Sequence, residues 1–269
     1  MTIFFIILGT FIAGVGSVFV ANFIAWKIMA RFSDYLLSFA AGTLLATAFL
    51  NLIPESFEIS SYSPHLMSWL LAGLLFFFLL DKTQFYHHGH EHGMSHDINE
   101  LANSKVHDKN HRQTEPEEIN KNNIWPVLVI GDAIHCFGDG VLIASAFIAN
   151  WNLGVLTTFA VLAHEIPHHV GDLVVVSKSL SSKRDALKKV SIAGCFAVLG
   201  GIFGFVFLES FIEFLPYFLI LASSSFIYVS LADLIPQLQK KVSIFETVRQ
   251  MLWLISGVVL IATVSHLSH

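Results

Sequence analysis

The sequence predicts an all-α, polytopic membrane protein with eight transmembrane helices. Hydrophobic residues make up 54% of the chain and charged residues only 13%, whereas soluble domains carry roughly 25% charged residues. The apolar residues also gather in runs of about 20, the length that a helix needs to cross a bilayer. The expected spans are residues 3–26, 34–57, 65–86, 124–149, 152–177, 190–208, 212–238 and 250–267.

The basic residues predict the orientation of these spans. All 15 Lys and Arg lie at or in the connections that follow the first, third, fifth and seventh spans. The connections around Ser60, Asn150 and Ser210 carry none, and neither do the two ends of the chain. By the positive-inside rule, the basic connections face the cytosol and both termini lie outside it.

The first span is too long for the apolar part of a signal peptide and is expected to remain as a helix. With no organelle signal evident, the plasma membrane is the default location.

The long polar connection over residues 87–123 is expected to be a disordered cytosolic loop within a single transmembrane domain, residues 1–269. Seven of the 14 histidines lie between His87 and His111, and the surrounding Asn, Lys, Glu and Asp residues cannot form a core. A His-rich tract of this kind is typical of metal binding. A solvated linker with no metal-binding role is the alternative interpretation. We expect the main activity of the protein to persist without this loop, with altered regulation.

The fourth expected span carries a cluster of polar side chains. His135 and Asp139 are four residues apart, and Asp132 precedes His135 by three, so all three lie near one helical face. Such groups are costly in hydrocarbon unless they meet a partner, an ion or water. Their presence predicts a functional site in this span.

The fifth expected span repeats the pattern. His164, His168 and Asp172 recur every four residues, and Glu165 and His169 lie on an adjoining stripe. Imidazole and carboxylate together suit zinc and its first-row neighbours. The two spans therefore predict a divalent-metal site between them, for passage of the metal through the membrane. Gly138, Gly140 and Gly171 are expected to let these two helices approach each other, and Pro167 is expected to kink the fifth.

Other interpretations of the same residues remain open. A single buried histidine is usually a hydrogen-bonded core residue, but this explanation does not cover so many donors in two spans. The segment His164-Glu165-Ile166-Pro167-His168 also fits the His-Glu-x-x-His pattern of an intramembrane zinc metalloprotease, with Glu165 as general base. Pro167 argues against it, because the pattern needs a regular helix. A metal sensor that does not translocate ions is a third class. Nothing indicates a nucleic-acid partner.

Two motifs give the chain a resemblance to the ZIP (Zrt-, Irt-like) metal transporters, nearest their histidine-rich subgroup. The first is His135 to Gly140, which is similar to the pattern His-Asn-Phe-x-Asp-Gly. The second is His164 to Asp172, which is similar to His-Glu-x-Pro-His-Glu-x-Gly-Asp. Leu52 to Glu55, Tyr228 to Pro236 and the His-rich loop also resemble the family, so the similarity covers the whole chain.

The resemblance implies a fold in which the first three and last three helices are related by inversion around the fourth and fifth. It implies a transporter rather than an enzyme, moving Zn²⁺, or Fe²⁺, Mn²⁺ or Cd²⁺, into the cytosol, and a homodimer in the bilayer. The implied transport-site ligands are His135, Asp139, His164, Glu165 and His168.

Three further residues are candidate ligands, and two of them depart from the family pattern. Cys136 replaces the usual Asn and is either a soft ligand or a packing residue. His169 replaces the usual Glu and slightly favours zinc over the harder manganese, and Asp172 completes the fifth-span face. Asn51 stands where a His is common. The expected sixth span lacks an acidic residue over residues 191–208, which leaves a second metal position open.

Overall fold

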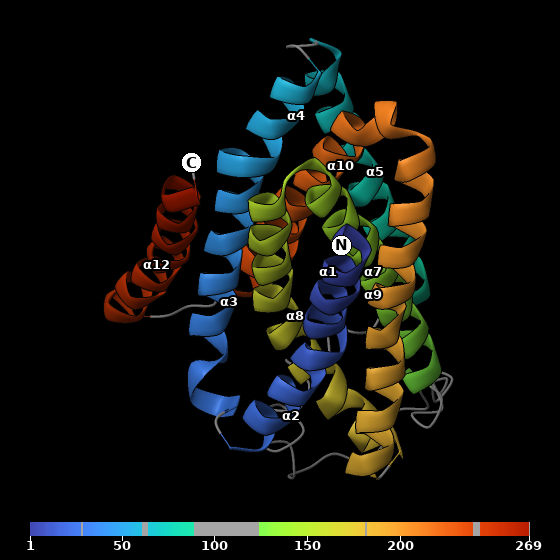
Figure 1. The fold of residues 1–269 in the computed structure, drawn as a ribbon. Coiled ribbons are helices and arrows are strands. Elements are labelled where there is room, and N and C mark those ends of the chain that lie inside the picture. The colour runs from blue at the N-terminus through green and yellow to red at the C-terminus, as the bar shows by residue number, and fades with distance from the viewer. Residues whose placement is uncertain (28, 61–63, 89–123, 181, 239–242, 269) are drawn as a thin grey trace, which may run out of the picture.

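The computed structural model describes residues 1–27, 29–60, 64–88, 124–180, 182–238 and 243–268, and within these residues the regular structure is entirely helical (Figure 1). The His-rich loop expected over residues 87–123 lies almost entirely outside the described residues. The elements are α1 (Thr2–Phe11), η1 (Ile12–Gly16), α2 (Ser17–Lys27), α3 (Met29–Thr47), η2 (Ala48–Leu52), α4 (Ile53–Ile59), α5 (His65–His88), α7 (Ile124–Ala149), α8 (Trp151–Leu180), α9 (Lys183–Ser210), η4 (Ile212–Phe214), α10 (Leu215–Tyr228), η5 (Val229–Leu234), α11 (Ile235–Leu238) and α12 (Ile244–Ser268).

Contiguous elements join into helical segments that coincide with the expected ranges. The largest differences are at α9 and α12, which begin at Lys183 and Ile244 rather than at residues 190 and 250. α9 starts with the polar turn Lys183-Arg184-Asp185, and the first two turns of α12 contain Glu246, Thr247 and Arg249, so a search for apolar runs detects only the part that follows. A helix therefore extends beyond its apolar stretch where its first turns contain charged or polar residues.

Six helices in the described part of the chain are long and apolar enough to cross a membrane. They cover Thr2–Ile24, Asp34–Ile59, Trp125–Ala149, Lys183–Ser210, Ile212–Leu234 and Ile244–Leu267. The apolar part of α5 described here, His65–Leu80, is shorter. The 30-residue α8 is long enough, but its His, Glu and Asp side chains lower its mean hydropathy. The protein is thus a multi-pass membrane protein.

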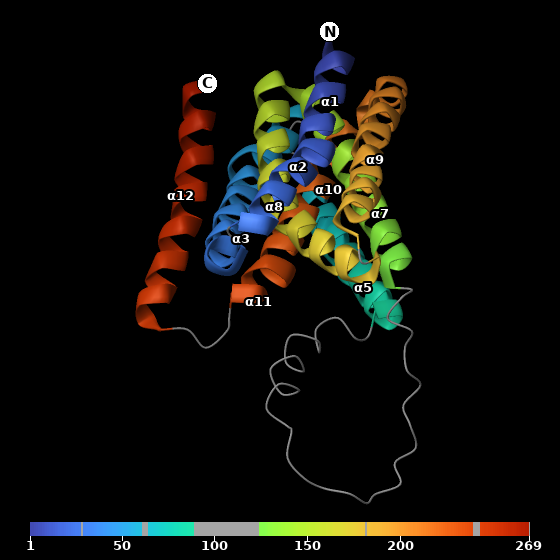
Figure 2. The ribbon, with the colours of Figure 1, turned by 90° about the horizontal axis from the view of Figure 1, so that it is seen from below.

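The helices form a bundle with α8 inside it, α7 packed against α8 and α9, and α12 at its edge, packed against α3 (Figures 1 and 2). Both chain ends lie at one end of this bundle, and the C-terminal ends of α5 and α11 lie at the other (Figure 2). Glycines allow the closest helix approaches. A Cβ atom on Gly140 of α7 would collide with the carbonyl oxygen of Ala197 in α9, and one on Gly200 would collide with that of Phe137.

This packing corrects the expectation for the glycines of the fourth and fifth spans. Gly140 faces α9 rather than α8, and a Cβ atom on Gly138 or Gly171 would have no neighbour within 4 Å. The spacing of small residues shows which face of a helix permits close contact, but it does not identify the partner helix. The prediction that these glycines join α7 to α8 is wrong.

Two larger apolar clusters lie at different levels along α8. One includes Leu153, Ala160 and Val161, together with residues of α1, α3, α7 and α10. The other includes Val170 and packs against α2 and α9. The polar side chains between Val161 and Val170 therefore lie in a layer between two apolar clusters, which is where an ion site inside a membrane protein is expected.

Candidate metal centre

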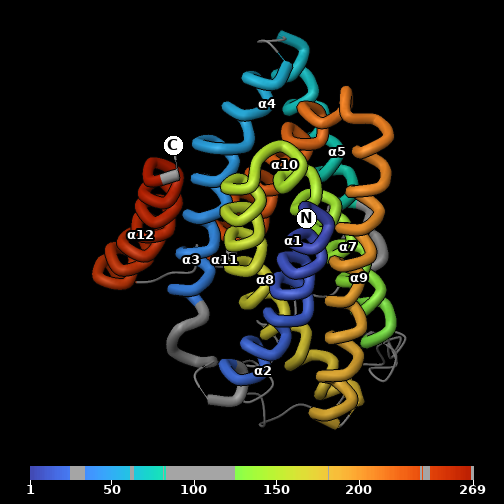
Figure 3. The backbone as a smooth tube through the Cα atoms, in the orientation of Figure 1, coloured from blue at the N-terminus to red at the C-terminus, as the bar shows by residue number. Residues whose placement is uncertain are grey.

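The turn between α7 and α8 aligns the polar residues of the two helices. Asn150 is the only residue between them; its side chain accepts a hydrogen bond from the backbone N–H of Asn152 at 2.8 Å and so caps α8. The two helices then run in opposite directions (Figure 3). His135 and Asp139 precede Asn150 by 15 and 11 residues, and His164 follows it by 14. Antiparallel packing consequently brings these side chains to the same depth in the bundle.

The first donor group consists of His135, Asp139, His164 and Glu165, and one ligand atom from each lies within 4.8 Å of all the others. His164 Nε2 lies 3.2 Å from Asp139 Oδ2 and 3.3 Å from Glu165 Oε1. His135 Nε2 lies 3.3 Å from the same Glu165 oxygen and 4.0 Å from Asp139 Oδ2. A tetrahedral zinc ion with bonds of about 2.0–2.1 Å holds its ligands roughly 3.3–3.4 Å apart. The spacing of this group fits such an ion.

The donor atoms of this group face one another without forming hydrogen bonds. Among the described residues, Asp139 Oδ2, His164 Nε2 and Glu165 Oε1 are buried and have no hydrogen-bond partner. Buried polar atoms in proteins are nearly always hydrogen-bonded, so each exception needs an explanation. Convergence on one cation explains all three, because ligand lone pairs then point at the ion and not at each other.

The second donor group consists of Asp132, Cys136, Glu165 and His169, all of them buried. His169 Nε2 lies 3.0 Å from Glu165 Oε2 and 3.5 Å from Asp132 Oδ1. The Cys136 sulfur lies 3.6 Å from Asp132 Oδ1 and 3.7 Å from Glu165 Oε2. Glu165 therefore directs one carboxylate oxygen into each group and bridges them.

Hydrogen bonds outside the two groups set the orientation of two imidazole rings. His164 Nδ1 lies 3.3 Å from the carbonyl oxygen of Ala160. Because a carbonyl only accepts, Nδ1 carries the proton in the neutral ring, and the Nε2 lone pair faces the first donor group. Ser17 Oγ donates its proton to the carbonyl of Gly14 at 2.7 Å, so it accepts from His169 Nδ1 at 2.9 Å. This directs the Nε2 lone pair of His169 into the second group, as the partners of metal ligands commonly do.

The third donor group consists of Asp132, His168 and Asp172. His168 Nδ1 lies 3.2 Å from Asp172 Oδ2 and 3.8 Å from Asp132 Oδ1, and 40% of the His168 side chain is exposed. The resemblance implied that His168 joins His135 and His164, but its ring centre is 5.4 Å from that of His135 and it falls in a separate donor group. The three groups follow one another along α7 and α8 and are connected by Glu165 and Asp132.

Two contributors were not among the candidates from sequence. Asp132 was noted only for its helical face, yet it belongs to the second and third groups; its spacing of four from Cys136 was the available signal. Ser17 lies 152 positions from His169. No pattern within one helix indicates that contact, since it depends on how α2 packs against α8.

The geometry separates the two histidines of the protease pattern. No donor group of the described residues contains both His164 and His168, although a zincin site needs both on one zinc ion. Pro167 does not interrupt α8, which continues as one helix through that residue. The protease interpretation is disfavoured by the positions of the ligands and not by a broken helix.

Comparison with known proteins identifies the family. A family model described as ZIP zinc transporter matches residues 1–265. The chain belongs to the ZIP zinc transporter family. This agrees with the resemblance drawn from the two motifs, and membership of a transporter family excludes an enzyme as the interpretation of His164 to His168. The buried His, Asp and Glu cluster fits the metal site that such a transporter needs.

Several zinc transporters from animals are similar over most of this ZIP chain. The zinc transporter ZIP13 homolog of Drosophila melanogaster is 26% identical, over 86% of this chain and 77% of its own. Human zinc transporter ZIP13 is 27% identical, over 90% of this chain and 71% of its own. Human zinc transporter ZIP4 is 27% identical over 76% of this chain, but the match covers only 38% of ZIP4.

Proposed function

We propose that this ZIP protein carries Zn²⁺ across a membrane into the cytosol by alternating exposure of the donor groups between α7 and α8. The single observation that carries the proposal is the sharing of Glu165 and Asp132, which links three donor groups in a row along both helices. A closed site binds its ion and keeps it, whereas neighbouring sites with a common ligand let the ion move by exchanging one ligand at a time. The ligands are His135, Cys136, Asp139, His164, Glu165, His168, His169 and Asp172, with Asp132 added.

Zn²⁺ is the ion that this donor set favours. Four imidazoles and one sulfur make the set softer than an all-oxygen site, which disfavours Mn²⁺ and leaves Cd²⁺ and Fe²⁺ as competitors. Protonation of an imidazole competes directly with the metal, so release at lower pH is part of the proposed mechanism. The relatives named above are zinc transporters, which supports the same ion here.

The proposed arrangement has eight spans, with three-helix units inverted around α7 and α8. Helix contacts support it: α1 packs on α9, α3 on α12 and α5 on α10. In the inverted relation, the second span (α3) corresponds to the seventh (α10), and the third span (α5) corresponds to the eighth (α12). The contact of α3 with α12 therefore corresponds to the contact of α10 with α5. The sequences agree as well. Leu52-Ile53-Pro54 and Leu234-Ile235-Pro236 each begin at the last residue of a π-helical turn, η2 or η5.

This arrangement gives the proposed topology. Both termini lie at the same end of the bundle in Figure 2, as an even number of crossings requires. The positive-inside rule assigns that end to the outside of the cell, with the plasma membrane as the proposed location. The single domain of residues 1–269, the metal-binding role of the loop over residues 87–123 and the homodimer remain predictions.

The test is Zn²⁺ uptake into vesicles containing the purified full-length protein. We expect saturable uptake that disappears in an Asp139→Ala, Glu165→Ala double variant. The matched control is Glu209→Ala, Glu213→Ala, because these two glutamates are exposed near the α9–η4 junction and belong to no donor group. Zinc bound in stoichiometric amounts without uptake above that of empty vesicles would contradict transport and favour the sensor.

A further inference from the structure

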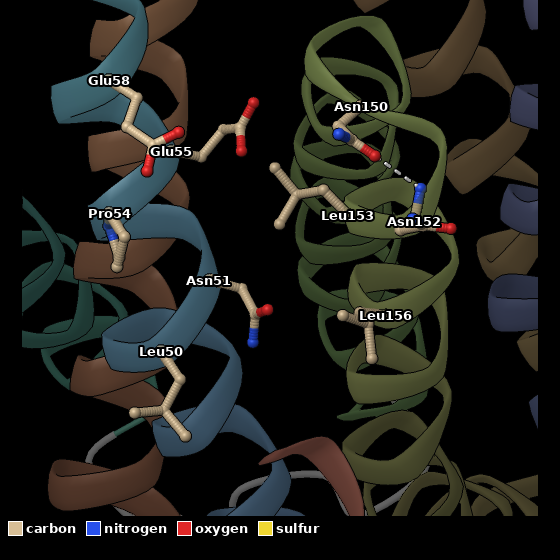
Figure 4. A pocket seen from close by; sticks show the side chains of 9 residues that line it. All are labelled: Leu50, Asn51, Pro54, Glu55, Glu58, Asn150, Asn152, Leu153 and Leu156. Atoms are coloured by element: carbon tan, nitrogen blue, oxygen red, sulfur yellow. Dashed lines mark hydrogen bonds between the residues drawn. The ribbon is translucent and has the colours of Figure 1, made fainter. Parts of the chain in front are cut away.

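A pocket of about 60 Å³ lies between the end of the α3–η2–α4 segment and the start of α8 (Figure 4). Asn51, Glu55 and Glu58 line it from one side, and Asn150 and Asn152 line it from the other. A single water molecule needs about 10–15 Å³ on this measure. The pocket thus has room for an ion with part of its hydration shell, and none of the three donor groups lines it.

The charge of the pocket favours a cation. Glu55 and Glu58 are one helical turn apart on α4, where like charges oppose each other, and no Lys or Arg lines the pocket. The partial positive charge at the start of α8 offsets some of this repulsion. However, Asn150 already caps that helix end through the N–H of Asn152, so two further carboxylates exceed what capping requires.

A buried amide provides an independent indication of a ligand. Asn51 is only 8% exposed, its side chain extends toward α8, and its Nδ2 has no hydrogen-bond partner among the described residues (Figure 4). Its Oδ1 accepts a hydrogen bond from Ser265 Oγ at 2.7 Å. A hydroxyl both donates and accepts, and the two ends of an amide exchange by rotation. After that rotation Nδ2 donates to Ser265 and the amide oxygen faces the pocket as a ligand.

The pocket is aligned with the metal centre along α8. Leu156 in its wall, Ala160 and His164 follow at intervals of four residues, so the pocket lies about 12 Å from the first donor group. Leu156 packs with Ala46 and Ile261 in an apolar cluster between these levels. Thr47 and Thr157, on the two helices that flank this cluster, also have buried hydroxyls without a hydrogen-bond partner among the described residues.

We propose that this pocket is an outer capture site, where the Glu55 and Glu58 carboxylates and the Asn51 amide oxygen hold a partly hydrated divalent cation before it reaches the first donor group. The proposal rests on the proposed function, because capture has meaning only for an ion that goes on to cross. The apolar cluster around Leu156 closes the passage in this conformation, and the unpaired threonine hydroxyls serve the ion when the passage opens.

The experiment measures Zn²⁺ uptake against zinc concentration for full-length protein in vesicles. We expect a Glu55→Gln, Glu58→Gln variant to raise KM roughly five- to tenfold while the maximal rate stays within about twofold, since removing peripheral charges mainly slows association. The control is Glu209→Gln, Glu213→Gln, which makes the same charge change outside the pocket. We expect an Asn51→Asp variant to lower KM, because it adds a carboxylate where the amide is.

Each other result overturns the proposal in a distinct way. An unchanged KM in the Glu55 and Glu58 variant shows that the pocket does not capture zinc, and equal KM changes in the control assign the effect to surface charge alone. A lower maximal rate with a lower melting temperature and an unchanged KM assigns the carboxylates to stabilising the start of α8. The proposed transport function, as distinct from the capture site, is contradicted only if the unaltered protein takes up no zinc.

Discussion

The first and second donor groups share Glu165 but differ in exposure and in chemistry. In the first group, 31% of the His135 side chain is exposed and all donors are nitrogen or oxygen. In the second group no residue is more than 4% exposed, and Cys136 adds a sulfur. Under the proposed function, we expect a division of roles: an ion exchanges with the surroundings at the first group and is enclosed at the second, with one carboxylate common to both.

Replacement of the shared ligand is expected to have the largest effect. Glu165→Gln removes an anionic oxygen from both groups at once, so we expect Zn²⁺ uptake to fall roughly 100-fold or more, beyond the 10- to 100-fold that loss of a ligand's supporting partner costs. Uptake into vesicles measures this, with Glu209→Gln as the control. Uptake within a fewfold of that control would contradict the role of Glu165 as a ligand shared by the first and second donor groups.

Removal of the hydrogen bond to His169 tests the second group alone. Ser17→Ala leaves the Nδ1 proton of His169 without its acceptor and lets the ring choose the other tautomer, so we expect about a tenfold loss of zinc affinity. Ser145→Ala is the matched control, since Ser145 is equally buried and its one hydrogen bond within the described part of the chain is to the carbonyl of Leu142. Rescue by Ser17→Thr separates this orienting role from packing. Equal losses in Ser17→Ala and the control would contradict it.

The smallest expected effect concerns the choice of ion. Cys136→Ser replaces a soft donor with a hard one, so we expect the ratio of Cd²⁺ to Zn²⁺ uptake to fall several-fold, up to about tenfold. Cys195→Ser is the control, because Cys195 is exposed on α9. An unchanged ratio would mean that Cys136 only packs and that ions bypass its sulfur.

The helix ranges and the meeting of the two motifs were predictable from sequence, whereas the partners of the other helix faces were not. The helix ranges follow from apolar runs, and the meeting of His135 and Asp139 with His164 follows from their nearly equal distances from Asn150. The packing of Gly140 on α9 and the hydrogen bond from His169 to Ser17 depend on which helix lies alongside. Periodicity within a helix describes a face and contains no information about its neighbour.

The division of the donor residues into three groups also could not be predicted from the sequence. Residues that share a helical face looked equivalent in sequence, whereas rotamers and the second helix decide which atoms converge. His168 illustrates this, because it keeps the spacing of a ligand to the first group yet turns toward Asp172.

The one-residue turn at Asn150 has a consequence for how this protein can change through evolution. Inserting or deleting one residue between Asp139 and His164 would rotate the following donors by about 100° around the axis of α8 and shift them by about 1.5 Å. Every donor on that helix would then leave its register with α7 together. We therefore expect the segment from Asp132 to Asp172 to keep a fixed length among relatives, with variation in length only beyond its two ends.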